Sequence, residues 1–105
     1  MDDSDRLDDV LQVLGDERSR TILRELARND GPLAAQQLAE QLEIPQSTTY
    51  RKLDDLTETP LVEERVGLDE GGHHRARYSV TVDGVVVSLD GDGLHVETRL
   101  DGEEE

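Results

Sequence analysis

The apolar residues of this chain change their spacing once, close to Pro60. Before Pro60 they recur every three or four positions in four successive stretches, and after it they alternate with polar residues. A period near 3.6 is typical of an amphipathic helix, and a period of 2 is typical of a half-buried strand. The sequence therefore predicts an α+β fold of four helices followed by β-hairpins.

The four helical stretches are separated by residues that end helices. Leu7, Val10, Leu11 and Leu14 share one face of the first, and the second begins at Asp16, whose carboxylate suits a helix N-cap. The third runs over about residues 33–42 and the fourth over about residues 46–59. Between them stands Pro45, which cannot continue a helix and disfavours helical geometry in the residue before it.

Two hairpins follow, each around a glycine-rich turn. The first joins a strand near residues 64–68 to a returning strand at 74–82 through a turn at 69–72, and the second joins 85–89 to 94–100. We expect residues 1–84 to form one domain, 85–100 to form a hairpin extension, and 101–105 to be a disordered acidic tail.

Composition narrows the class of protein. The chain has 26 acidic and 11 basic residues, a net charge of −15, and no cysteine, so disulfides and thiolate metal sites are excluded. The acidic N-terminus lacks the features of a signal peptide, and no apolar run approaches the roughly 18 residues of a membrane span. We expect a soluble cytoplasmic protein without membrane contact. The regular apolar spacing argues against disorder, which this charge alone would suggest.

The basic residues are almost all arginine, with Lys52 the one lysine. An acidic surface that prefers arginine resembles the proteins of extremely halophilic archaea. In molar salt the Debye length falls to about 3 Å, so repulsion between carboxylates is largely screened.

The third helix, a three-residue break and the fourth helix form a candidate helix-turn-helix. Several segments resemble ArsR-type winged helix-turn-helix regulators, and together they span roughly residues 10–84: Leu14-Gly15-Asp16-Glu17-Arg18, Leu38-Ala39-Glu40-Gln41-Leu42, Ser47-Thr48-Thr49-Tyr50-Arg51 and Arg77-Tyr78-Ser79-Val80-Thr81. The resemblance implies a winged helix-turn-helix fold and DNA binding. It implies no metal inducer, because the cysteines of the metal sensors are absent.

Two groups of residues are predicted to contact DNA. The N-terminal half of a recognition helix reaches base edges in the major groove, and here it carries Gln46, Ser47, Thr48, Tyr50, Arg51 and Lys52. The first hairpin, the predicted wing, carries His74, Arg75 and Arg77 beside its turn and would contact the backbone or the minor groove. For the helix, the alternative is an ordinary solvated face. For the hairpin, the alternative is a chance cluster of basic residues that pair with Glu63 and Glu64.

Catalytic and cofactor motifs are missing from the sequence. No glycine-rich loop precedes a helix, and no nucleophile–base pair is legible. His73 and His74 would point to opposite faces of a strand, which disfavours a metal site with His95. We expect no enzyme activity, cofactor, metal or identifiable small-molecule effector. We expect the arginines of the second helix to pair with Asp16, Glu17 and Glu25.

Two functions fit these observations. The first is a transcription regulator that binds double-stranded DNA as a homodimer, joined through its first helix and C-terminal hairpin. The second is a winged-helix module that binds protein without sequence-specific DNA binding, since a fold does not fix a function.

Overall fold

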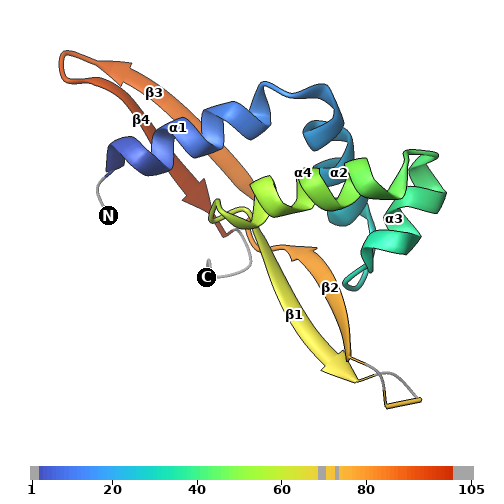
Figure 1. Cartoon of the computed structure of the whole chain (residues 1–105). Coiled ribbons are helices and arrows are strands. Elements are labelled where there is room, and N and C mark those ends of the chain that lie inside the picture. Colours follow the sequence, from blue (N-terminus) through green and yellow to red (C-terminus); the bar gives the residue numbers. More distant parts are fainter. Residues whose placement is uncertain (1–2, 69–70, 73, 101–105) are drawn as a thin grey trace.

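In the computed structural model, residues 3–68, 71–72 and 74–100 are described. The order of elements is the predicted one, four helices followed by two antiparallel hairpins (Figure 1). The elements are α1 (Asp3–Leu14), α2 (Glu17–Arg28), α3 (Ala35–Leu42), α4 (Gln46–Thr57), β1 (Val62–Leu68), β2 (His74–Val80), β3 (Gly84–Asp90) and β4 (Gly93–Arg99). The predicted tail at 101–105 lies outside the described residues, as do residues 69, 70 and 73 of the first hairpin loop.

One apolar core joins the helices to the base of the first hairpin. Val10 of α1, Ile22 of α2, Leu38 of α3 and Leu53 of α4 are completely buried in it. Tyr78 of β2 closes the cluster from the hairpin side. The fold is therefore a winged helix-turn-helix, in which β1 and β2 form the wing. None of the described helices is long and apolar enough to cross a membrane.

Asp16 caps α2 as predicted. Its carboxylate accepts a hydrogen bond from the backbone N–H of Ser19 at 2.9 Å, which satisfies one of the unpaired donors at the helix start. The same carboxylate lies 3.1 Å from Nζ of Lys52 on α4. One side chain thus starts α2 and links it to α4.

The third helix begins at Ala35, so the prediction that it starts near residue 33 was wrong. Leu33 is extended, and its backbone N–H and C=O exchange hydrogen bonds with Tyr78 at 2.9 and 2.8 Å. The side chain of Gln37 then accepts a hydrogen bond from the N–H of Ala34 at 2.8 Å. A short bridge to the wing therefore replaces the first predicted turn of this helix.

The turn between α3 and α4 depends on Glu43, which adopts the left-handed conformation with φ 57°. The N–H of Ile44 donates to the carbonyl of Ala39 at 3.0 Å, which closes the end of α3. Pro45 then places the chain for α4, which begins at Gln46 as predicted.

The fourth helix ends at Thr57, two residues before the predicted end. The hydroxyl of buried Thr59 donates to the carbonyl of Leu56 at 2.7 Å and accepts from the N–H of Leu61 at 3.1 Å. These two bonds turn the chain directly from the helix into β1. The strand accordingly starts at Val62 rather than near residue 64.

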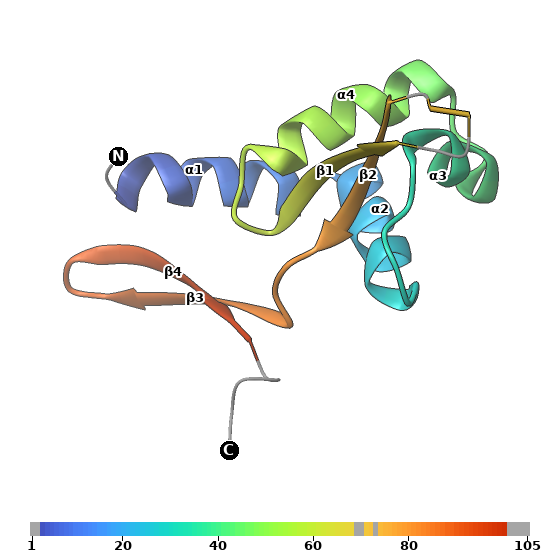
Figure 2. The same ribbon diagram turned by 90° about the horizontal axis from the view of Figure 1, so that it is seen from below.

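The two hairpins are separate two-stranded sheets that leave the helical body in different directions (Figures 1 and 2). In the wing, Val62 pairs with Val80 and Leu68 with His74. The return strand ends at Val80, so its predicted extension to residue 82 was wrong. The second hairpin runs beside α1, which packs on β4 (Figure 2).

Candidate nucleic-acid interface

The orientation of α4 follows from its buried line. Thr49, Leu53 and Leu56 face the core and are completely buried, and the hydroxyl of Thr49 donates to the carbonyl of Pro45 at 3.1 Å. The opposite face of the helix is thereby turned to solvent. Figure 1 shows that the N-terminal end of α4 lies beside α3, as in a helix-turn-helix.

The structure brings most of the predicted recognition residues to one exposed end of α4. Gln46, Ser47, Tyr50 and Arg51 are exposed there, and Thr48 is half-buried. The exposed groups include an amide, a hydroxyl and a guanidinium, which can pair with base edges. Further along the helix the exposed side chains are acidic, namely Asp54, Asp55 and Glu58.

Lys52 makes a contact within the protein that the sequence did not predict. Its side chain is 20% exposed, and its ammonium group is engaged by the carboxylate of Asp16. The pair fixes α4 against the start of α2, and the carboxylate partly neutralises the lysine. Arg51 is then the exposed cation on the N-terminal half of the recognition helix.

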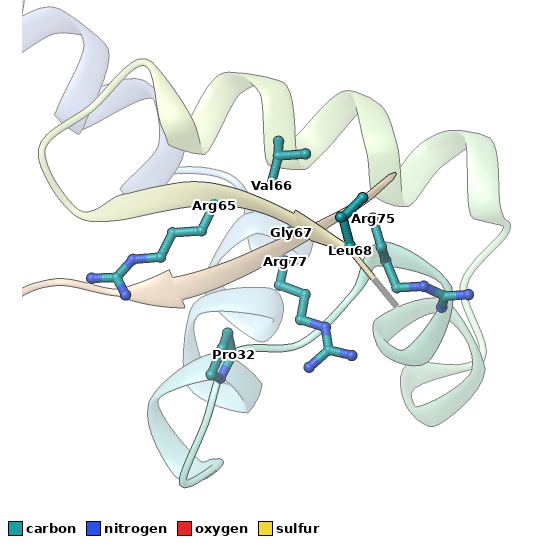
Figure 3. Close-up of a pocket in the computed structure, with 7 residues that line it drawn as sticks. All are labelled: Pro32, Arg65, Val66, Gly67, Leu68, Arg75 and Arg77. Carbon is teal, nitrogen blue, oxygen red and sulfur yellow. The ribbon is translucent and has the colours of Figure 1, made fainter. Parts of the chain in front are cut away.

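The strand register divides the wing into two faces. Arg65 pairs directly with Arg77, and Gly67 pairs with Arg75, so three arginines share one face. In Figure 3, Val66 points toward α4, whereas the guanidinium groups of Arg65 and Arg77 extend to the other side of the strands. This arginine face, Arg65, Arg75 and Arg77, borders a depression of about 340 Å³ that also contacts Pro32.

Arg65 was not among the predicted site residues. The sequence contained the signal, because strands ending at 68 and restarting at 74 set residue 65 opposite residue 77. Arg65 Nε donates to Glu63 at 2.8 Å, and 77% of its side chain is exposed. Arg75 and Arg77 are also exposed on β2, while His74 is its first residue.

Carboxylates lie between α4 and the other face of the wing. Burial raises the pKa of Tyr78, and the nearby charges of Glu64 and Asp54 raise this pKa further. Val66 and Leu68 on the same wing face are 61% and 66% exposed. The space between the recognition helix and the wing is therefore bordered by both apolar and acidic side chains.

Among the described residues, no ion pair joins an arginine of α2 to Asp16, Glu17 or Glu25, although such pairs were predicted. Asp16 pairs with Lys52 instead, and Arg20 donates to the backbone carbonyl of Leu14 at 2.8 Å. Within the part of the chain that the structure describes, no cluster of three histidine or acidic side chains is placed to hold a metal ion. His73 lies outside that part.

Residues 17–65 match the family model of the IclR helix-turn-helix domain. The chain is a winged helix-turn-helix DNA-binding regulator. The match begins at α2, includes α3 and α4, and ends within β1, so it covers the helices that position the exposed end of α4. It confirms the predicted DNA-binding regulator but gives no support to the ArsR-type resemblance. No curated protein matches the chain.

Proposed function

We propose that the regulator reads the major groove with the N-terminal half of α4. The observation that carries this proposal is the exposure of Gln46, Ser47 and Arg51 on a helix whose other side is locked into the core. Glutamine can pair with adenine and arginine with guanine, whereas serine can form hydrogen bonds with several bases. Thr48 and Tyr50 border this surface, and Lys52 contributes mainly by holding the helix in place.

The wing supplies contacts that do not depend on base sequence. Arg75, Arg77 and Arg65 project from one face of a two-stranded ribbon, a geometry suited to the phosphate backbone or the minor groove. Exposed guanidinium groups bind phosphate oxygens through charge-assisted hydrogen bonds. His74, at the start of β2, was predicted as a wing contact together with Arg75 and Arg77.

The regulator acts as a homodimer. A single module of this size buries roughly 600–1,000 Å² on DNA, and two-fold proteins double this by reading two half-sites. In this scheme residues 1–84 bind DNA, and residues 85–100 are available for self-association. The proposed function is DNA binding in the cytoplasm, and it requires no catalytic step, cofactor or small-molecule effector.

The acidic surface is suited to a salt-rich cytoplasm like that of extreme halophiles. A net charge of −15 on 105 residues produces strong self-repulsion in dilute buffer. Molar potassium chloride reduces the range of that repulsion to about 3 Å. The affinity for DNA that matters for the proposed function is therefore the affinity measured in molar potassium chloride.

The test is selection of bound sequences from a random library of DNA duplexes in about 2 M potassium chloride, which screens the acidic surface. Arg51→Ala is expected to relax the preference at one base position and to weaken binding by about 1–3 kcal/mol. Arg6→Ala is the matched control, because it removes the same charge from α1, at the far end of the helical body (Figure 1).

A wild-type protein that selects no sequence would contradict the proposal and favour the protein-binding alternative. Arg51→Ala with unchanged sequence preference would show that α4 does not read the bases.

A further inference from the structure

The second hairpin has one uncharged face in a strongly acidic protein. The β3–β4 register pairs Val85 with Thr98, Val87 with Val96 and Leu89 with Leu94, and alternation puts all six on the same face. The opposite face carries the polar and charged residues of the ribbon, including Ser88, His95, Glu97 and Arg99.

Among the described residues, contacts cover only the base of this uncharged face. Val85 and Val96 pack against the core, and α1 contacts β4. Toward the turn, Val87 is 43% exposed, Leu94 is 46% exposed and Leu89 is 75% exposed. The end of the β3–β4 hairpin extends away from the helical body (Figure 2), and the apolar residues near its turn are exposed.

The β3 strand also leaves one of its two edges unpaired among the described strands, because β3 and β4 form a sheet of two. Exposed edges usually carry charges or proline, which prevent pairing with other chains. Residues 84–89 have neither, and three successive valines give the segment a high preference for strand pairing. On β4, by contrast, Glu97 and Arg99 are exposed.

We propose that the β3 strands of two copies pair antiparallel around a two-fold axis. This inference rests on the proposed homodimer and names its surface. The β3–β4 hairpins of the two copies then form one four-stranded sheet. The apolar residues Val87, Leu89 and Leu94 of both copies make a continuous surface across it. A two-fold contact needs a patch that complements itself, and an antiparallel strand pair satisfies this requirement.

Charge identifies a second copy as the occupant. Two chains of net charge −15 can approach most closely where neither presents a carboxylate, and residues 84–89 are such a segment. A pairing centred on Val87 also sets Asp90 of each copy opposite Gly84, so no two carboxylates face each other. The ribbon and the wing leave the body in different directions (Figure 1), so α4 and the wing stay free for DNA.

The test measures the oligomeric state of the full chain by light scattering without DNA, in about 2 M potassium chloride, which screens the acidic surface. Leu89→Lys replaces an apolar side chain of the continuous face by a cation whose burial in the dimer costs hydration, at a position already exposed, and is expected to weaken the dimer at least tenfold (about 1.4 kcal/mol). Leu100→Lys is the matched control, since Leu100 is also exposed but follows β4. It is expected to dimerise like the wild type.

A wild-type monomer across the concentration range would overturn the proposal, and so would an unchanged dimer in the Leu89→Lys variant. Loss of the dimer in Leu11→Lys but not in Leu89→Lys would overturn it in favour of α1. Circular dichroism confirms that each variant is folded. Binding to a single half-site is measured separately, so a dimer that binds no DNA would refute the proposed function while supporting this interface.

Discussion

Replacing Asp16 by alanine is expected to destabilise the fold through two contacts at once. The variant loses the hydrogen bond from Ser19, which as an N-cap is worth about 1 kcal/mol. It also loses the ion pair with Lys52, which is partly exposed and worth about 0.2–1 kcal/mol. The sum is a loss of about 1–2 kcal/mol in the free energy of unfolding, which lowers the melting temperature by about 5–15 °C in a domain of this size.

Asp16→Asn separates the two contributions, because asparagine caps helices as well as aspartate does. This variant is expected to lose only the charge interaction with Lys52, about 0.2–1 kcal/mol. The pH dependence checks the assignment. The hydrogen bond from the backbone of Ser19 holds the pKa of Asp16 below its usual value, with a smaller contribution from Lys52.

A lowered pKa in the folded state means that the carboxylate contributes stability above the unfolded pKa of about 3.9. The contribution is lost as the pH falls through the folded pKa. The stability gap between the wild type and Asp16→Asn is therefore expected to be constant from about pH 7 to pH 5 and to shrink below about pH 4. Urea unfolding in constant molar salt measures it. Equal losses for Asp16→Ala and Asp16→Asn, or a gap that widens in acid, would refute the reasoning.

Three further predictions concern the turn, the wing and the salt dependence. Glu43→Gly is expected to stabilise the fold by up to about 1 kcal/mol in urea unfolding. Relief of the left-handed strain at this residue, about 1–2 kcal/mol, exceeds the entropic cost of glycine, about 0.4–1 kcal/mol. Destabilisation would contradict the assigned conformation. Arg65→Gln is expected to weaken binding to all DNA sequences by a similar factor, and an effect at one base position would instead place Arg65 at a base edge. The slope of log DNA affinity against log salt concentration is expected to be flatter than about −4, the value for four phosphate contacts, because carboxylates near the DNA retain cations; a steeper slope in a folded protein would refute this reasoning.

The order of the elements could be predicted because the relevant patterns are local. Asp16 was identified as a cap from its position alone, and the break at Pro45 separated the two helices of the helix-turn-helix. The start of α3 could not be predicted, because Leu33 has helical surroundings in sequence and becomes extended through its bonds to Tyr78. That contact joins residues 45 positions apart in the chain.

The candidate site was predictable to a similar extent. The exposed face of α4 follows from the spacing of its buried residues, so Gln46 and Arg51 could be identified from the sequence. The partner of Lys52 could not, since Asp16 is brought to it only by the packing of α2 against α4. Arg65 was missed for a different reason: its position opposite Arg77 required an explicit strand register rather than a list of basic residues.

An acidic surface and DNA binding make opposite electrostatic demands, and the fold separates them only in part. The cations Arg51 and Arg77 lie on the N-terminal half of α4 and on one face of the wing, but Asp54 and Glu64 lie between these surfaces, close to Tyr78. A phosphate backbone that contacts both cationic surfaces brings its own charge near those carboxylates. Because like charges at such distances repel unless a counterion separates them, binding must retain or take up cations there. Under the proposed function, that uptake opposes the counterion release at the arginines and flattens the salt dependence of the affinity for DNA.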